Sequence, residues 1–345
     1  MKITLFLSFL LLIASCTSKT ASTTYQLQLI DSNVQFGHRG ISIDDASNYW
    51  LSGEHGSFVV SSDKGLTWTE DTLPGGQHFD FRDIAVISRE EAFMISSGEN
   101  KAIIVHTLDA GKSWSIVHTD TTPGCFFNGI GFFDELNGLA YGDQVNGQID
   151  LLFTNNGGKT WSHNNAVKVP QALEGEAGFA ASGTGLVIVN ETTAFIAQGN
   201  ASKTRILRTN DAGETWQALE TPMCNGTGSG IYAMDFFNDQ LGIVVGGNWE
   251  HINDTTDICY ITKNGGQTWE KPIRSPYGYR SGVSFIDENT IVACGRNGVD
   301  ISYDQGQHWK SISSEGFYAV DSDGQNIFLS GASGKLGQLI PSPKR

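Results

Sequence analysis

The stretch Thr107-Leu-Asp109-Ala-Gly111-Lys-Ser113-Trp114 is one of six copies of an eight-residue pattern, Ser/Thr-x-Asp/Asn-x-Gly-x-Thr/Ser/His-Trp. The tryptophans that end the copies are separated by 46, 47, 55, 53 and 40 residues, and they are six of the eight tryptophans in the chain. A repeat of roughly 45 residues indicates a propeller or a solenoid. The copies occupy residues 61–68, 107–114, 154–161, 209–216, 262–269 and 302–309.

Each position of the pattern has a structural role. The Asp or Asn at the third position can accept hydrogen bonds from nearby backbone amides and hold a tight turn. The Gly at the fifth position allows a positive φ, and the Trp at the eighth position lies past the turn, where its ring can pack between neighbouring repeats. Calcium is disfavoured, because one carboxylate per turn is too few for a shell of about six to eight oxygens. We therefore predict structural roles for Asp63, Asp109, Asn156, Asp211, Asn264, Asp304, Trp68, Trp114, Trp161, Trp216, Trp269 and Trp309.

Short β-rich runs lie between the copies and predict the blades of a propeller. In the sixth repeat, runs at 282–285, 290–293 and 298–301 precede the turn, and a fourth run follows it. A seventh unit has three runs, at 317–320, 326–329 and 335–339, and no turn pattern, so Tyr25–Ile30 can supply its fourth strand and close the ring. The prediction is an all-β, seven-bladed β-propeller over residues 25–340 with a tail at 341–345; six or eight blades would need a unit merged or split.

The repeated turn resembles the Asp box, or BNR repeat, of sialidases and related propellers. From about Tyr25 to about Leu339 the chain resembles the photosystem II stability/assembly-factor-like family of seven-bladed Asp-box propellers. The resemblance implies a WD40/YVTN/BNR-like fold, frequent export and lipid anchoring, and the binding of partner polypeptides during the assembly of a membrane complex. It also implies that the boxes lie at the outer edges of the blades, away from any ligand site.

The first residues, MKITLFLSFLLLIASC, predict that the protein is exported to the bacterial cell envelope. Lys2 precedes an apolar run of about a dozen residues, which is too short for a membrane span of about 20 and is typical of a signal peptide, here residues 1–15. Ile13-Ala14-Ser15-Cys16 resembles a lipobox, so Cys16 is the predicted lipidation site, and residues 16–24 form a flexible tether. The alternative is an ordinary signal peptide with a chance cysteine. Whether the protein faces the periplasm or the cell surface stays open.

The composition excludes several classes of function. The net charge of −15 argues against nucleic-acid binding by phosphate neutralisation. Four cysteines follow Cys16, and none has the CxxC spacing of a metal or redox site, so disulfides and buried thiols both remain open. No metal-hydrolase, nucleophile-elbow or dinucleotide motif is present, and we expect no metal, no cofactor and no assignable catalytic residue.

Repeat register predicts a cluster of arginines on the face opposite the boxes. Arg39, Arg82 and Arg280 occupy the same slot, just before the innermost strand of their units. Arginine binds carboxylates and phosphates in a bidentate manner, so this slot is a candidate ligand or partner site. The competing interpretation is that each arginine pairs with an acid and holds blades together. The other candidates are His38 and Tyr279 beside the slot, and Arg296, Glu54 and Glu99 in turns between second and third strands.

Two functions fit this cluster. The first is a protein-binding, assembly-factor-like module that grips an acidic patch or a carboxyl group of a partner. The second is a sialidase or another glycoside hydrolase, in which three arginines bind the substrate carboxylate and Tyr279 with Glu176 forms the nucleophilic pair. The sequence lacks an Arg-Ile-Pro motif and an obvious acid for the second function. A protein partner is therefore expected, a glycan ligand is the alternative, and the oligomeric state is open.

Overall fold

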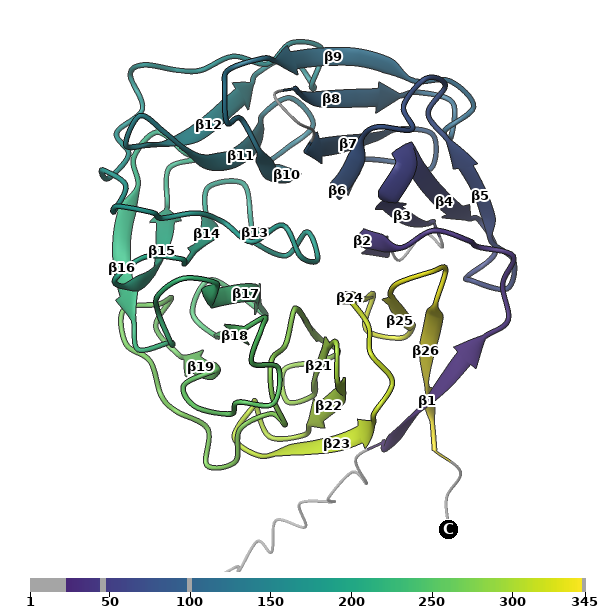
Figure 1. Cartoon of the computed structure of the whole chain (residues 1–345), viewed down its shortest axis with the longest axis vertical. Helices are drawn as coiled ribbons and strands as arrows, with labels where there is room; N and C mark the ends of the chain where they lie inside the picture. The colour runs from purple at the N-terminus through teal and green to yellow at the C-terminus, as the bar shows by residue number, and fades with distance from the viewer. Residues whose placement is uncertain (1–22, 44–47, 98–100, 343–345) are drawn as a thin grey trace, which may run out of the picture.

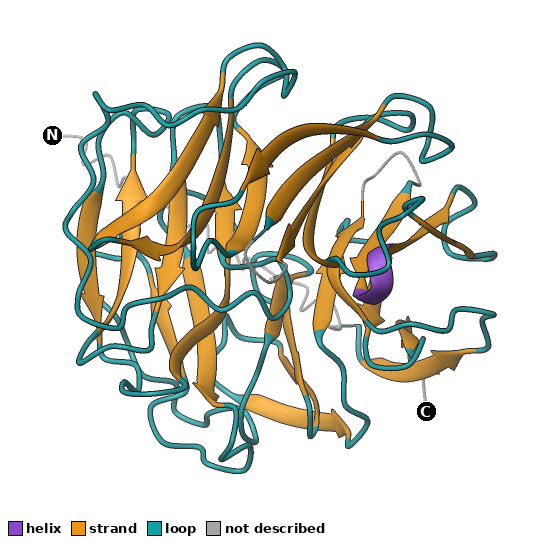
Figure 2. Cartoon of the chain, turned by 45° about the horizontal axis from the view of Figure 1, so that its top comes forward, coloured by secondary structure: helices purple, strands orange, loops and turns teal. Residues whose placement is uncertain are grey.

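The seven predicted blades are present and surround a central axis (Figure 1). The computed structural model describes residues 23–43, 48–97 and 101–342. Within this part the chain is almost entirely strand and loop, with one short 3-10 turn, η1 (Glu54–Gly56), as Figure 2 shows. The all-β, seven-bladed prediction is confirmed.

The first four blades follow the chain, each from its innermost strand outward. They are β2 (His38–Ile43), β3 (Tyr49–Gly53), β4 (Ser57–Ser61) and β5 (Thr69–Thr72); β6 (Asp80–Val86), β7 (Ala92–Ser97), β8 (Ala102–Thr107) and β9 (Ser115–Asp120); β10 (Phe127–Phe132), β11 (Gly138–Val145) and β12 (Gln148–Thr154); and β13 (Leu186–Ile188), β14 (Ala194–Gln198), β15 (Thr204–Thr209) and β16 (Gln217–Thr221).

The last three blades complete the ring. They are β17 (Ser229–Phe236), β18 (Gly242–Asn248) and β19 (Cys259–Thr262); β20 (Gly282–Phe285), β21 (Ile291–Gly295), β22 (Gly298–Ser302) and β23 (Trp309–Ser313); and β24 (Ala319–Ser322), β25 (Ile327–Ser330) and β26 (Leu336–Pro341), joined by β1 (Tyr25–Ile30).

The N-terminal strand closes the ring, as the sequence predicts. β1 pairs antiparallel with β26, from Tyr25 opposite Pro341 to Ile30 opposite Leu336. The pairing gives blade 7 its fourth strand and covers an edge that would otherwise stay open. One further bond, from the Ser342 amide to the Thr24 carbonyl at 2.7 Å, joins the two ends of the chain just beyond the strands.

Side-chain hydrogen bonds build each box turn. In blade 2 the Asp109 carboxylate accepts bonds from the Ser113 amide at 2.8 Å and the Ser113 hydroxyl at 2.6 Å. The Thr107 hydroxyl donates to Asp109 at 2.9 Å and accepts from the Gly111 amide at 3.0 Å, and Gly111 has a φ of 83°. Asn156 and Asn264 make the same turn with an amide group, so the turn requires an acceptor oxygen and not a charge.

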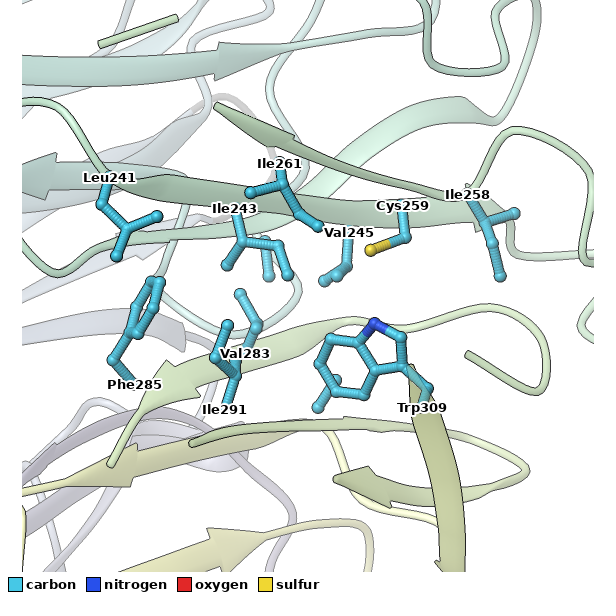
Figure 3. Close-up of a cluster of buried hydrophobic side chains, with 12 residues drawn as sticks. Leu241, Ile243, Val245, Ile258, Cys259, Ile261, Val283, Phe285, Ile291 and Trp309 are labelled. Atoms are coloured by element: carbon cyan, nitrogen blue, oxygen red, sulfur yellow. The ribbon is translucent and has the colours of Figure 1, made fainter. Parts of the chain in front are cut away.

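The box tryptophans pack against the blade that precedes them. Figure 3 shows Trp309 of the sixth box beside Val245 and Cys259 of blade 5, in a cluster that also contains Val283 and Ile291 of blade 6. Trp309 is 1% exposed. Burial of this apolar surface between blades stabilises the ring by about 25 cal/mol for each Å² removed from water.

Three aspartates join the innermost strands of neighbouring blades. Asp83 accepts bonds from its own next amide, Ile84, at 2.8 Å and from Ile130 of blade 3 at 2.9 Å. The other two repeat this double acceptance: Asp235 binds Phe236 and Phe285, and Asp321 binds Ser322 and Ile43, all at 2.7–2.8 Å. Each carboxylate therefore links two blades close to the central axis.

Blades 3 and 5 depart from the predicted four strands. In the described chain their sheets end at β12 and β19, and the segment after each box makes only one bridge with its own blade, Ser162 with Phe153 and Glu270 with Ile261. Each segment then pairs in parallel with the box of the next blade, through Lys168–Thr215 and Arg274–His308. These two blades lack an outer strand because the connecting segments run to the neighbouring blade.

The structure bears on the cysteines that follow Cys16 but not on the predicted signal peptide. Cys125, Cys224, Cys259 and Cys294 are free thiols and three of them are buried. In the described residues no helix is long and apolar enough to cross a membrane. The predicted signal peptide and the lipidation site at Cys16 lie outside the residues that the structure describes.

Candidate functional site

A pocket of about 460 Å³ opens on the face where the chain enters the innermost strands. Arg39, Arg82 and Arg296 contribute its positive charge, and no Asp or Glu among the described residues lines it. The remaining lining residues are aromatic or small: Phe179, Ala180, Ala181, Tyr232, Trp249, Tyr279, Ser281 and Tyr318. In a chain of net charge −15 the pocket is a local cationic site.

Arg39 is a partly buried pocket arginine that is held by an aromatic ring and not by an acid. Its guanidinium lies 4.1 Å from the centre of the Tyr318 ring, which fixes the plane of the side chain. Its Nε is buried and has no hydrogen-bond partner in the described structure, and no described carboxylate forms an ion pair with it. Because no described carboxylate pairs with Arg39, its guanidinium at the pocket wall favours an anionic ligand.

The other two pocket arginines are held by the protein to different degrees. Arg82 pairs with Asp80 at 2.7 Å and donates from Nη1 to the Ala180 carbonyl at 3.3 Å. Burial lowers the pKa of Arg82 and raises that of Asp80, although each charge partly offsets the shift of the other. Arg296 is exposed and donates to the Trp249 carbonyl at 3.4 Å, so most of its donors face solvent.

Aromatic rings form another wall of the pocket. Phe179 stacks on Tyr232 with ring centres 3.9 Å apart, and Tyr232 meets Tyr279 edge-on at 4.7 Å. Tyr279 is 4% exposed, and burial raises its pKa above the usual value, so its hydroxyl stays protonated at neutral pH. This wall offers apolar surface and a neutral hydroxyl beside the arginines.

A loop of blade 4 reaches the centre of the ring and carries part of the pocket (Figure 1). We call residues 178–184 the central loop. Its Gly178 amide donates to Asp143 at 3.1 Å, and its Thr184 carbonyl accepts from Met234 of blade 5 at 3.1 Å. At Gly183, where φ is 76°, an added Cβ would lie 2.3 Å from the Asp83 carboxylate, so only glycine fits there.

Two predicted ligand residues do not reach the pocket. Arg280 is 1% exposed and binds Asp300 through Nε at 2.8 Å and Nη2 at 2.5 Å; this is the ion pair of the competing interpretation, but it lies within blade 6 and does not join two blades. His38 is fully buried, its Nε2 lies 3.2 Å from the Ser57 hydroxyl, and burial lowers its pKa to about 4. The prediction that these side chains contact a ligand is corrected, because both are enclosed within the blades.

The acidic candidates do not provide a hydrolase site in the described chain. Glu54 does not line the pocket; its carboxylate accepts a 3.4 Å bond from the Gly37 amide. Glu176, the predicted partner of Tyr279, is 1% exposed and bound by Arg205 at 2.5 and 2.6 Å. Glu99 lies outside the described residues. The described residues also bring together no cluster of His, Cys, Asp and Glu that could hold a metal ion.

Sequence reasoning missed most of the aromatic wall. Tyr318 immediately precedes the innermost strand of blade 7 and occupies the slot that Ser281 has in blade 6, but blade 7 has no box to set the register. Phe179 lies in the central loop, and its only signal was the interval of 55 residues between Trp161 and Trp216, the longest of the five. Tyr232 lies inside β17 and carried no signal.

Comparisons with known proteins agree with this architecture. A family model described as photosynthesis system II assembly factor YCF48 matches residues 18–125, and the BNR/Asp-box repeat model matches residues 260–271. No protein of curated function matches the chain. Similar solved structures include YCF48 bound to a D1 peptide, with a TM-score of 0.67 and 16% identity over 92% of this chain and 96% of that one.

Other propellers are similar at comparable levels. YCF48 from Cyanidioschyzon merolae has a TM-score of 0.61 and 16% identity over 91% of this chain and 98% of that one. The Niastella koreensis GH74 enzyme has a TM-score of 0.65 and 15% identity over 91% of this chain but 53% of that one. At such identities the structural likeness establishes the fold only. Together with the family match, it confirms the predicted resemblance: the chain is a seven-bladed Asp-box β-propeller similar to the YCF48 assembly-factor family.

Proposed function

We propose that this protein is a protein-binding, assembly-factor-like module, and that its arginine pocket receives a carboxylate of a partner polypeptide. The observation that carries the proposal is Arg39, a guanidinium that lines the pocket, stacks on Tyr318 and has no described carboxylate as an ion-pair partner. Arg296 adds a second cation, and the aromatic wall accommodates the residue that bears the carboxylate. The family model supports a partner that is a protein, and one similar structure is of YCF48 with a peptide.

Glycoside hydrolysis is less well supported by the geometry. That chemistry uses carboxyl groups, or a tyrosine activated by one, on either side of the scissile bond. Here no described carboxylate lines the pocket, and Glu176 is bound to Arg205. The pocket therefore favours binding of an anion over cleavage of a sugar.

Replacing Arg39 by alanine is expected to weaken peptide binding by about 10- to 100-fold, the effect of losing a charge-assisted hydrogen bond. Arg39→Lys is expected to recover only part of the affinity, because an ammonium cannot bind in a bidentate manner or stack on Tyr318 in the same way. The measurement is fluorescence anisotropy with a library of peptides that have free C-terminal carboxylates or acidic side chains.

Arg89→Ala is the matched control, because it removes an exposed arginine from the turn between β6 and β7 and should leave affinity unchanged. Equal binding by Arg39→Ala and the parent protein would refute the proposed site. Hydrolysis of a fluorogenic sialoside by the parent, lost in Arg39→Ala, would instead make the protein a glycosidase.

We also propose that a lipid on Cys16 holds the propeller at the cell envelope, on the strength of the lipobox-like Ile13-Ala14-Ser15-Cys16. A Cys16→Ser variant is expected to move from the membrane fraction to the soluble fraction, because the thioether and its acyl chains cannot form. Metabolic labelling with a radioactive fatty acid should mark the parent and not the variant. A variant that stays with the membrane would show that another element anchors the protein.

A further inference from the structure

Trp249 differs in its surroundings from the other tryptophans of the chain. Trp50 and the six box tryptophans are buried or half-buried, whereas Trp249 is 47% exposed. It lies on the loop between β18 and β19 and lines the arginine pocket. Tryptophan is enriched among the residues that carry most of the binding energy of protein interfaces, so an open indole beside a cationic pocket indicates a contact surface.

The other aromatic rings of the pocket are already packed. Tyr232 contacts Phe179 on one face and the edge of Tyr279, and a guanidinium covers the Tyr318 ring. Among the described residues, no aromatic ring packs against Trp249 and no cation lies over its indole. Trp249 therefore offers an aromatic face that the described chain itself does not use.

The surrounding backbone holds the indole of Trp249 in place. Gly228 has a φ of 68° and lies so close to the ring that an added Cβ would be 2.9 Å from the indole Nε1. The loop is also held at Ile252, whose carbonyl accepts bonds from Asn297 Nδ2 at 2.7 Å and from the Tyr279 amide at 2.9 Å. A side chain that is ordered before binding loses less entropy when a ligand arrives, which favours affinity.

The indole lies next to the positive charges of the pocket. Arg296 donates from Nη1 to the Trp249 carbonyl at 3.4 Å. Burial raises the pKa of Tyr279, and the charges of Arg39 and Arg296 partly offset that shift, so both guanidinium groups lie near the Tyr279 hydroxyl. An anion bound by these arginines would therefore lie beside the Trp249 side chain, which lines the same pocket.

The charge of the pocket restricts what can stack on Trp249. Three arginines line the pocket and no described Asp or Glu does, so a lysine or arginine of the partner would be repelled. A neutral aromatic ring is favoured, because it buries apolar area and gains a stacking interaction. We propose that Trp249 determines the specificity of the pocket by stacking on a Phe, Tyr or Trp side chain next to the bound carboxylate, a role that rests on the proposed function. The recognised segment of the partner thus combines an acid with an aromatic residue.

Fluorescein-labelled hexapeptides test this specificity by anisotropy. Each peptide carries one glutamate, and the residue before or after it is Phe, Leu, Ala or Lys in a background of serine and glycine. The Phe peptides are expected to bind the parent protein about tenfold more tightly than the Ala peptides, with the Lys peptides weakest. Trp249→Ala should remove the preference for Phe and keep the dependence on glutamate, whereas Trp249→Phe should retain part of the preference.

Phe237→Ala is the matched control, because Phe237 is 45% exposed in the turn between β17 and β18, at the opposite end of blade 5. It should keep the full preference for Phe over Ala. The same preference in Trp249→Ala as in the parent, or equal binding of Phe and Leu peptides by the parent, would overturn the role of Trp249. Binding that Arg39→Ala weakens would still support the pocket in that case. Absence of peptide binding, or binding that does not depend on Arg39, would instead refute the pocket and the role of Trp249 with it.

Discussion

Replacing Arg280 by alanine is expected to destabilise the propeller by about 3–5 kcal/mol, the cost of leaving a buried charge without its partner. Arg280 donates to the Asp300 carboxylate, to the Tyr279 carbonyl at 2.7 Å and to Asn297 at 2.6 Å. Without it, Asp300 would keep only the 2.8 Å bond from the Tyr277 amide, and its Oδ1 already has no partner in the described structure. Urea denaturation followed by tryptophan fluorescence measures the loss.

Two further variants test whether the unpaired buried charge causes the loss of stability in Arg280→Ala. Lys203→Ala breaks a surface pair with Glu220, whose side chains are 55% and 64% exposed, and should cost at most about 1 kcal/mol. Replacing Arg280 and Asp300 together by Met and Leu should cost less than Arg280→Ala, because no unpaired charge remains. If Arg280→Ala were as mild as Lys203→Ala, the buried Asp300 charge would not depend on Arg280 for its stability.

Acidification from pH 8 to pH 5 is expected to stabilise the propeller. Burial raises the pKa of Asp83 to about 8, of Asp321 to about 7 and of Asp235 to about 6, despite the backbone bonds that favour their charged forms. Between about pH 4 and pH 8 the folded protein therefore holds protons that the unfolded chain releases. Each such proton lowers the free energy of unfolding by about 1.4 kcal/mol for every unit that the pH rises.

Other groups limit this effect at low pH. Burial lowers the pKa of His38 to about 4, so below about pH 6.5 the unfolded chain binds a proton that folded His38 does not, and acidification there lowers the free energy of unfolding. This loss comes from one group and opposes the gain from the three aspartates. Hydrogen bonds that lower the pKa of box aspartates such as Asp63 and Asp109 are lost only near and below about pH 4. Together these shifts place maximum stability near pH 5.

Urea denaturation at pH 5, 6, 7 and 8 checks the prediction for the parent protein and two variants. Asp83→Asn removes the group that titrates highest and should flatten the slope between pH 7 and pH 8. Asp71→Asn alters an exposed carboxylate and should leave the slope unchanged. A parent protein that gained stability from pH 5 to pH 8 would show that the two backbone bonds outweigh burial at these aspartates.

The fold could be predicted because its signals are local. The box needs an acceptor, a glycine and a tryptophan at fixed spacing, and Asp109, Gly111 and Trp114 supply them within six residues. Closure by Tyr25–Ile30 followed from the three runs of blade 7, which left one strand missing. The absence of an outer strand in blade 3 was not predicted, because the segment after Trp161 carries no mark that it pairs with blade 4.

The site was harder to predict because the sequence register is one residue off at Arg280. The Arg280 amide bonds to the Gly246 carbonyl of the preceding blade, as the His38 amide bonds to Gly331, so Arg280 occupies the buried slot of His38 and not that of Arg39. Arg39 lies within β2 and rests on Tyr318 in the pocket, whereas Arg280 is enclosed by Asp300 of β22 and by Asn297. Repeat register places a side chain on a face of the ring, but contacts from other strands decide whether it reaches solvent.

The closure of the ring by β1 also has a mechanical consequence. β26 begins near the pocket face, where the Gly334 amide bonds to the Phe36 carbonyl at 2.7 Å, so its far end, Pro341, and the paired Tyr25 lie toward the box face. A force that pulls Tyr25 away from a partner held in the pocket runs along β1, and all six residue pairs with β26 resist it at once. A force that separates Tyr25 from Pro341 would instead open the same pairs one by one. The domain should therefore resist unfolding by a force along β1 more strongly than by a force that pulls β1 and β26 apart.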